Sequence, residues 1–277
     1  TRESQVAVVV AAMGETTDLL LQAATIAADG EFEKAQRLAV RVGDQALENA
    51  KGSVATEQLK ASLSDHVADL SRLLQGISLL RESSPQTIDE ILSHGERISA
   101  VVLAAILKGE GLEAVFVDAR DWVRTDDSFG QAQVDFVTTQ NQLEALKESW
   151  ADAIPINTGF LGRSADGKTT TLGRNGSDYT ATLVAQILGA SEVQFWADLP
   201  GVMTADPQLV SDAYPLRTMS YMEAVELANY GGRIFHPRTM MPLMESRIPL
   251  RILNCKDPED SGTLASRGAA AHPPWPR

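Results

Sequence analysis

Two glycines, an arginine, a serine and an aspartate lie within six residues of one another, in G-R-N-G-S-D at positions 173–178. An apolar pattern at helical spacing follows, so a helix is expected to begin near Ser177. The unpaired N–H groups and the dipole at a helix N-terminus attract anions. Arg174 adds a planar set of donors suited to a carboxylate or a phosphate. The stretch therefore indicates either an anion site or a tight turn with an ordinary helix cap and a solvated arginine.

A second candidate is Glu96, in the sequence S-H-G-E at positions 93–96. Gly95 lies in an apolar stripe at helical spacing, so another segment of backbone is expected to pack closely against it. Judged by its neighbours alone, Glu96 is a solvated helix glutamate, because an unpaired glutamate is seldom buried. His94 is interpreted as structural rather than catalytic.

Other polar clusters give weaker signals. Asp126 and Asp127 are adjacent, but no third acidic, histidine or cysteine ligand follows at a recognisable spacing, so no metal site is predicted. Asp198 directly follows an expected strand, a position where side chains of α/β proteins contact ligands. Cys255, the one cysteine, is expected to be a small buried hydrophobe.

Several blocks of this sequence, in this order, resemble the aspartate kinases of the amino-acid-kinase superfamily. The most specific is T-T-L-G-R-N-G-S-D-Y-T-A at 170–181, which is similar to the signature loop of that family. The others are V-V-A-A-M-G-E-T-T-D-L-L at 9–20, S-H-G-E at 93–96, T-G-F-L-G at 158–162, W-A-D-L-P-G-V at 196–202, T-A-D-P at 204–207 and F-H-P-R-T at 235–239. Together they cover the chain from about Val6 to Leu264.

The resemblance implies a three-layer α/β/α sandwich with a largely parallel central sheet. It also implies transfer of the γ-phosphoryl group of ATP, delivered with Mg²⁺, to the β-carboxylate of L-aspartate, the first step toward lysine, threonine and methionine. The residues implied to bind aspartate are Thr17, Glu96, Phe160, Arg174 and Ser177. Asp178 and Arg174 are the implied catalytic residues. The implied nucleotide-binding residues are Ala197, Asp198, Met203 and Arg233.

Two alternatives remain open beside this hypothesis. One is another kinase of the same superfamily, acting on glutamate, N-acetylglutamate, carbamate or a nucleoside monophosphate. The other is a non-catalytic aspartate-binding or assembly module. Thr17 has its own alternative, since a threonine at the start of a helix can simply cap it.

The chain also departs from the family pattern. The K-F-G-G segment that opens these kinases is not in it, so residues 1–265 are interpreted as a kinase domain lacking that strand and loop, and 266–277 as a disordered tail. Regulatory ACT domains and the homoserine dehydrogenase module of some members are absent as well, and are possible fused partners in the full gene product. In the half of the site that is implied to bind the nucleotide, four residues differ from the usual ones. Ala197 replaces threonine, Met203 replaces tyrosine, Gln208 replaces arginine and Arg233 replaces lysine.

Strands and helices must position these residues. Apolar and extended runs predict strands at 6–10, 112–117, 134–137, 154–160, 168–172, 192–196 and 248–253. Helical spacing predicts a helix that carries Leu19, Leu20 and Ala23 and two long helices between 31 and 80. It predicts others near 87–106, 140–150, 177–188, 220–230 and 237–246. The Asp166-Gly167 pair between two extended runs predicts a hairpin. Thr16 and Thr17, and the capping box 87–90, are expected to cap their helices.

The composition excludes some partners. A formal net charge of -13 argues against nucleic acid, which needs a basic face. No apolar run is long enough to span a bilayer, and a single cysteine gives no intrachain disulfide. A soluble, cytoplasmic protein is therefore expected, and the resemblance to the family implies a homo-oligomer.

Overall fold

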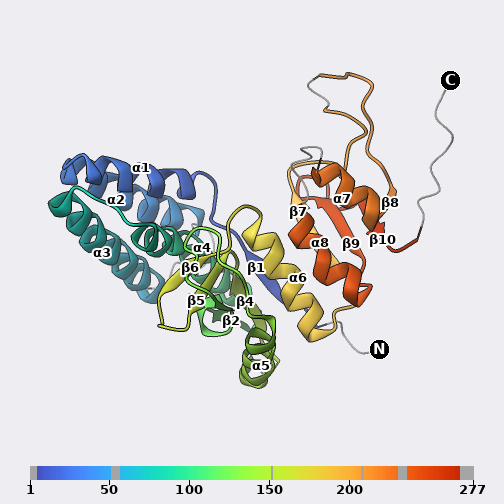
Figure 1. Cartoon of the computed structure of the whole chain (residues 1–277), viewed down its shortest axis with the longest axis horizontal. Coiled ribbons are helices and arrows are strands. Elements are labelled where there is room, and N and C mark those ends of the chain that lie inside the picture. The colour runs from blue at the N-terminus through green and yellow to red at the C-terminus, as the bar shows by residue number, and fades with distance from the viewer. Residues whose placement is uncertain (1–4, 51–56, 151, 207–208, 230–235, 269–277) are drawn as a thin grey trace. The chain divides into compact units, whose positions relative to one another are not determined.

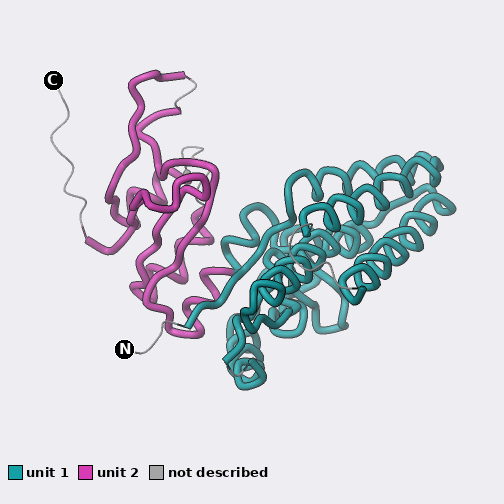
Figure 2. The backbone as a smooth tube through the Cα atoms, turned by 180° about the vertical axis from the view of Figure 1, so that it is seen from behind, with its two compact units in different colours: residues 1–180 teal, residues 181–277 magenta. Residues whose placement is uncertain are grey.

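The computed structural model describes residues 5–50, 57–150, 152–206, 209–229 and 236–268. The chain divides into two compact units, residues 1–180 and 181–277 (Figure 2). The boundary falls within one helix, α6 (Gly176–Leu188). Each unit is described by itself below.

A three-stranded parallel sheet forms the centre of unit 1. Its strands are β1 (Val8–Val10), β4 (Ile154–Thr158) and β2 (Ala114–Val117), in the order β1-β4-β2. Both pairings are parallel. Parallel strands covered by helices are rich in β-branched residues, which is why these apolar runs were recognisable in the sequence. The carboxyl ends of β1 and β4 therefore lie at one edge of the sheet.

Four helices pack together beside this sheet (Figure 1): α1 (Thr16–Ala28), α2 (Phe32–Asn49), α3 (Glu57–Leu80) and α4 (Pro85–Gly109). One side of α4 packs on the sheet through Ala100 and Ala104, which contact Ala114 and Ile156. Other residues of α4 belong to the large apolar core shared with α1, α2 and α3. Because it is buried on both sides, α4 fixes the helices relative to the sheet.

A second, smaller sheet of unit 1 has the order β3-β5-β6, with β3 at Arg124–Thr125, β5 at Leu161–Ser164 and β6 at Thr169–Thr171. The β5–β6 pair is antiparallel, and Gly167 has a φ of 80° in the turn. The hairpin predicted at Asp166-Gly167 is thus confirmed. The segment between β2 and β4 also contains the 3₁₀ turns η1 (Ala119–Asp121) and η2 (Glu148–Trp150) and the helix α5 (Phe136–Lys147).

Unit 2 is built on a mixed sheet with the order β7-β9-β10-β8. Its strands are β7 (Val193–Ala197), β8 (Thr218–Ser220), β9 (Leu250–Asn254) and β10 (Thr263–Ser266), and its helices are α7 (Tyr221–Asn229) and α8 (Pro237–Ser246). The core includes Met219, Ala224, Leu243 and Ile252. Parallel pairing of β7 with β9 and of β8 with β10, with helices against the sheet, agrees with the predicted α/β class.

Some local predictions were wrong. No strand forms at 134–137, because Asp135 accepts a hydrogen bond from the Thr138 amide and caps α5 instead. Helix α1 begins after Glu15 without a side-chain cap. Helix α4 begins earlier than expected, since the Ser84 hydroxyl caps it ahead of Pro85.

Two further predictions concern the end of the chain. Cys255 is exposed, not buried, because it lies in the turn after β9. The expected tail began at Ser266, but Ser266 is the last residue of β10. Positions 269–277 lie outside the described residues.

Candidate functional site

The turn between β1 and α1 is held by side chains of α4. The Ala12 amide donates to Glu96 Oε1 at 3.3 Å, and the Met13 amide donates to Ser99 Oγ at 3.0 Å. A Cβ on Gly95 would lie 2.9 Å from the Ala12 Cβ, so only glycine lets the helix pass this close. The close approach predicted for Gly95 is confirmed.

Glu96 is buried, with 5% of its surface exposed. The expectation of a solvated glutamate, drawn from its neighbours in sequence, was therefore wrong. Among the described residues no basic side chain forms an ion pair with Glu96, and burial raises the pKa of its carboxyl to about 7. A buried carboxyl without a cation suits an ammonium group brought by a ligand.

The link between β4 and β5 packs against the start of α6. The Gly159 amide donates to the Val10 carbonyl at 2.8 Å, which ties this link to the end of β1. A Cβ on Gly159 would lie 2.6 Å from the Ser177 Cβ. Ser177 is thereby brought to the same edge of the sheet as Val10 and the turn that follows it.

Phe160 adopts a left-handed backbone conformation, with a φ of 66°. Its amide donates to Thr180 Oγ1 at 3.1 Å, and its carbonyl accepts from the Leu172 amide at 2.8 Å. A Cβ on Gly176 would lie 2.6 Å from Phe160 Cδ2. The two hydrogen bonds hold this strained residue between β6 and α6.

Arg174 and Asp178 lie on the loop after β6 and in the first turn of α6. The Asn175 Nδ2 donates to Asp178 Oδ2 at 2.9 Å, and burial raises the pKa of the Asp178 carboxyl. Arg174 is exposed, and within the described part of the chain its guanidinium has no ion-pair partner. The helix predicted near Ser177 begins at Gly176, so the positive end of a helix dipole and an exposed guanidinium occur in the same short segment.

A substitution at Gly159 tests this packing. Gly159→Ala is expected to lower the free energy of unfolding by about 1 to 3 kcal/mol, because the new Cβ must displace the backbone at Ser177. Thermal or urea unfolding measures the change. Gly76→Ala in α3 is the matched control, since nothing lies within 4 Å of a Cβ at Gly76 and alanine favours a helix. Equal stabilities for the two variants would contradict the packing.

Thr17 lies half-buried in the first turn of α1, directly after the turn that Glu96 holds. The structure therefore gathers the ends of β1 and β4, the start of α6, and Glu96 at one edge of unit 1. Thr17 and Arg174 are not hydrogen-bonded to each other.

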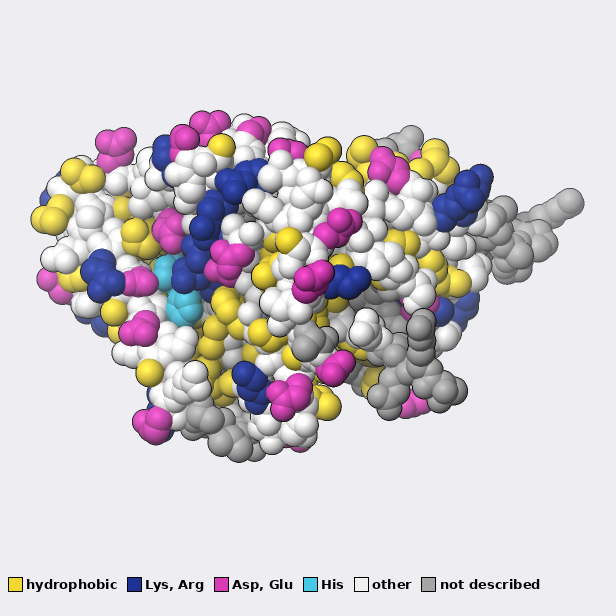
Figure 3. Space-filling view, turned by 90° about the horizontal axis from the view of Figure 1, so that it is seen from below, with side chains coloured by type: hydrophobic (Ala, Val, Ile, Leu, Met, Phe, Trp, Pro, Cys, Tyr) yellow, Lys and Arg dark blue, Asp and Glu magenta, His cyan; other side chains and the backbone are white. Residues whose placement is uncertain are grey.

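A half-buried network of charges joins α4 to the segment after β2. Arg120 Nη2 contacts Asp118 at 2.7 Å, and its Nη1 lies 3.5 Å from Glu90; Arg97 lies 3.6 Å from Asp118. These arginines keep the pKa of Asp118 below its usual value despite its burial. Figure 3 shows one face of the molecule, on which basic side chains form a row beside histidine side chains.

His66 of α3 and His94 of α4 form a buried pair. Their Nδ1 atoms are 3.0 Å apart, and the rings meet edge to face with centroids 5.1 Å apart. Burial, reinforced by Arg97, lowers the pKa of His66 to about 4 and that of His94 to about 2. Both rings are therefore neutral near pH 7, and one Nδ1–H donates to the other Nδ1. His94 thus has a packing partner, and the sequence had not singled out His66.

In unit 2, Ala197 ends β7 and its carbonyl accepts from the Cys255 amide at 2.9 Å. Asp198 is exposed and pairs with Lys256 at 2.6 Å. Met203 is half-buried and forms an isolated antiparallel β-bridge with Pro215. Arg233 lies outside the described residues.

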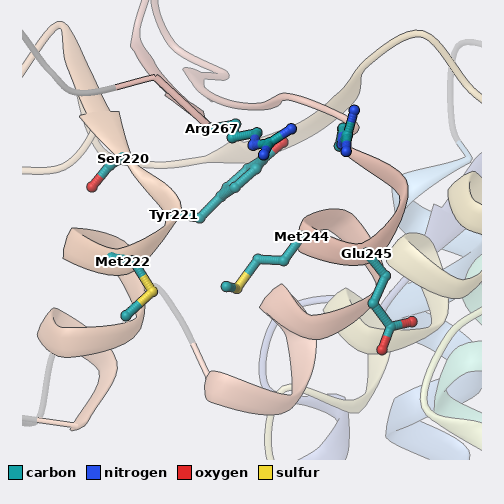
Figure 4. A pocket seen from close by; sticks show the side chains of 7 residues that line it. Ser220, Tyr221, Met222, Met244, Glu245 and Arg267 are labelled. Atoms are coloured by element: carbon teal, nitrogen blue, oxygen red, sulfur yellow. The ribbon is translucent and has the colours of Figure 1, made fainter.

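Two hollows in the described part of the chain are lined by other residues. One, of about 330 Å³, lies in unit 2 (Figure 4) and is lined by Ser220, Tyr221, Met222, Met244, Glu245, Arg247 and Arg267. The other, of about 270 Å³, is lined by Met13, Gly14, Glu15, Thr16, Gln45, Ala46, Glu48 and Asn49. None of the residues that the sequence assigned to substrate or nucleotide lines either one.

Across the described ranges, no group of three or more histidine, cysteine, aspartate or glutamate side chains is placed to hold a metal ion. In the same ranges no helix is both long and apolar enough to cross a membrane.

Comparison with known proteins gives consistent matches. The family described as "Amino acid kinase family" matches residues 1–254. "Lysine-sensitive aspartokinase 3" of Escherichia coli is 40% identical over 203 residues, which cover 71% of this chain and 45% of that protein. "Bifunctional aspartokinase/homoserine dehydrogenase 1, chloroplastic" of Arabidopsis thaliana is 35% identical over 208 residues, covering 75% of this chain and 23% of that protein.

Among solved structures, E. coli aspartokinase III in complex with aspartate and ADP matches with a TM-score of 0.87 and 32% identity. The match covers 96% of this chain and 59% of that one. The alignments with the two relatives span 45% and 23% of their lengths.

Proposed function

The chain belongs to the amino acid kinase family, and from that premise we propose that it is the kinase portion of an aspartate kinase. In this proposal it transfers the γ-phosphoryl group of ATP to the β-carboxylate of L-aspartate and yields 4-phospho-L-aspartate. The observation that carries it is the buried Glu96, which has no cationic partner among the described residues and lies at the sheet edge shared with Ser177. An amino acid supplies the ammonium group that this carboxyl lacks.

Each residue of the site has a proposed role. Glu96 accepts the amino group of aspartate, Arg174 binds a carboxylate through two parallel hydrogen bonds, and Ser177 donates to the same ligand. Phe160 and Thr17 line the pocket. Asp178 is proposed as the acidic catalytic residue that orients cationic groups in the reaction zone.

The reaction asks for positioning more than for proton transfer. The β-carboxylate of aspartate is already ionised at neutral pH, so it can attack the γ-phosphorus directly while the bond to the ADP oxygen breaks. The protein then contributes alignment of the two substrates and neutralisation of charge. Arg174, with its free guanidinium, is the residue of unit 1 best suited to that neutralisation.

ATP and its ion are proposed to contact unit 2. Ala197, Asp198, Met203 and Arg233 are the residues proposed for the nucleotide, and Mg²⁺ is proposed to arrive with the phosphates, which are its usual ligands beside one or two carboxylates. Asp198 is an exposed carboxylate at the end of β7, where its present partner is Lys256. An exposed pair of this kind exchanges partners at small cost.

The remaining proposals concern the wider protein. We propose a cytoplasmic homo-oligomer, with ACT or homoserine dehydrogenase modules as fused partners in the full gene product. One relative is named as a fusion with homoserine dehydrogenase. Light scattering on the purified natural polypeptide measures the oligomeric state.

The proposed function is tested by aspartate-dependent release of ADP from Mg-ATP, in the longest natural polypeptide that contains this sequence. A panel with glutamate, N-acetylglutamate, carbamate and UMP tests the other kinases of the superfamily. Aspartate binding by calorimetry is measured in parallel. Binding without ADP release would favour a non-catalytic aspartate-binding module, and release with another acceptor would replace aspartate as the substrate.

The binding of aspartate is expected to depend on pH through Glu96. Burial raises the pKa of this carboxyl to about 7, and an ammonium ligand favours its ionised form. Below about pH 7 the carboxyl must release a proton before the ligand binds, so the Kd of aspartate should rise up to about tenfold per pH unit. Calorimetry from pH 5.5 to 8 measures this change.

Glu96→Gln is the control for this pH dependence. The amide has the shape of the neutral acid but no charge, so the variant should bind aspartate weakly and equally across the pH range. A Kd for the wild-type protein that does not change between pH 5.5 and 7 would contradict the assignment of Glu96 to the ammonium group.

A further inference from the structure

Asp89 is a second buried carboxylate of α4, and neither the sequence nor the resemblance assigned it a ligand or catalytic role. It is 1% exposed. The Gly130 amide and the Thr171 amide both donate to its Oδ2 at 2.9 Å, and the Thr171 hydroxyl donates to its Oδ1 at 2.8 Å. Three donors satisfy the carboxylate, and in the described part of the chain no basic side chain pairs with it.

The groups that Asp89 holds lead directly to the proposed substrate loop. Thr171 is the last residue of β6, and Arg174 follows three residues later. Gly130 supports the same loop from the other side, because a Cβ on Gly173 would lie 3.2 Å from the Gly130 carbonyl oxygen. One carboxylate therefore fixes both the strand that enters the loop and the segment on which the loop rests.

A neighbouring contact fastens the other end of β6 to the same helix. Arg120 Nη1 donates to Thr169 Oγ1 at 3.0 Å and to Glu90 Oε1 at 3.5 Å. Strand β6 is thus attached to the first turns of α4 at Thr169, through Arg120, and at Thr171, through Asp89.

Helix α4 also carries Glu96. Asp89 and Glu96 are seven residues apart, which is two helical turns or about 10.5 Å along the axis, and they lie on the same face. The helix is buried on both sides and acts as a rigid spacer between the Arg174 loop and the Glu96 carboxyl.

We propose that Asp89 is a positioning residue for the substrate. By binding β6 and the segment around Gly130 to α4, it sets the separation between Arg174 and Glu96. This inference rests on the proposed function, in which Arg174 takes a carboxylate and Glu96 the ammonium group of the same amino acid. With Arg174 on the side-chain carboxylate, whose distance from the ammonium group differs between aspartate and glutamate, a set separation selects an amino acid of one length. Asp89 then governs the preference for aspartate over glutamate.

Asp89→Ala and Asp89→Asn test the role together. Alanine removes all three contacts, so the KM for aspartate should rise about 10- to 100-fold. The preference for aspartate over glutamate should fall at least about fivefold. The KM for ATP should stay within about twofold of the wild-type value. Asparagine can accept from both amides and donate to the Thr171 hydroxyl, so it should restore both values to within about threefold. Asp135→Ala is the matched control, because it removes the cap of α5 at the surface.

Hydrogen exchange gives a readout that does not depend on turnover. Peptides covering 130–133 and 171–176 should exchange faster in Asp89→Ala than in the wild-type protein, and Asp89→Asn should restore protection. Thr171→Val, which removes one of the three donors, serves if the alanine variant does not fold. It should give a smaller change in the same direction.

The outcomes separate the two proposals. A lower kcat with an unchanged KM for aspartate and unchanged preference would reduce Asp89 to a structural role. Unchanged exchange at 171–176 in Asp89→Ala would overturn the positioning role whatever the substrate is. A wild-type protein that neither binds aspartate nor acts on it would overturn the proposed function and, with it, the substrate that Asp89 is said to select.

Discussion

Arg174→Ala is expected to weaken aspartate binding by about 2 to 5 kcal/mol, which corresponds to a rise in Kd of about 30-fold or more. The guanidinium has no ion-pair partner among the described residues, so its donors are available to a ligand carboxylate. An effect of this size requires that the complex excludes water from the pair, so that removing the guanidinium leaves the ligand carboxylate unpaired. Calorimetry measures the Kd, and steady-state assays measure the KM for aspartate.

Two further variants sharpen this test. Arg174→Lys keeps the charge but loses the planar pair of donors, so it should fall between the wild-type protein and the alanine variant. Arg163→Ala removes another arginine of unit 1, one that pairs with Asp121 at 3.4 Å at the surface, and should change the Kd less than twofold. A Kd within about threefold of wild type in Arg174→Ala would remove Arg174 from the substrate site.

Acid is expected to destabilise the protein through His66 and His94. Both folded pKa values lie below the unfolded value of 6.5, so the unfolded chain binds protons first as the pH falls. The contribution of the pair is therefore complete above about pH 7 and is lost as the pH falls toward 4. At about 1.4 kcal/mol per pH unit for each ring, acidification from pH 7 to 5 should cost about 2 to 4 kcal/mol.

Glu96 acts in the opposite direction over the same range. Its folded pKa of about 7 lies above the ordinary 4.5, so its burial becomes less unfavourable as the pH falls from 7 to 4.5. Urea unfolding at pH 7 and pH 5 should therefore be compared in a Glu96→Gln background, with and without His66→Asn and His94→Asn. The loss of stability should be steeper in the protein that keeps both histidines.

NMR titration of the two rings provides an independent measurement that needs no variant. The ring signals should show no titration between pH 8 and 5 in the folded protein. A midpoint near 6.5 for either ring would contradict the neutral, hydrogen-bonded pair.

Local patterns in the sequence predicted much of the fold. The strand β1 is a continuous apolar run, β4 and β7 are short extended runs rich in apolar residues, and the hairpin at Gly167 has a turn sequence that needs a positive φ. The start of α6 and the close approach at Gly95 were also predicted, because the positions of glycines and the spacing of apolar residues indicate local backbone structure and packing.

The polar parts of unit 1 could not be predicted from local patterns, because their partners are distant in sequence. Glu96 meets the Ala12 amide 84 residues away, and Asp89 meets Thr171 82 residues away. By pattern alone, Glu96 was assigned to solvent and Asp89 to a capping box. The resemblance to a family, not periodicity, was what singled out Glu96.

The left-handed backbone at Phe160 has a consequence for molecular evolution. Glycine at this site would relieve the strain of the backbone at the loss of the ring. If the ring only filled space, descendants of this gene would be expected to drift to glycine or asparagine at position 160. If an aromatic residue persists at position 160 across distant relatives, selection has kept the ring for the contacts that it makes.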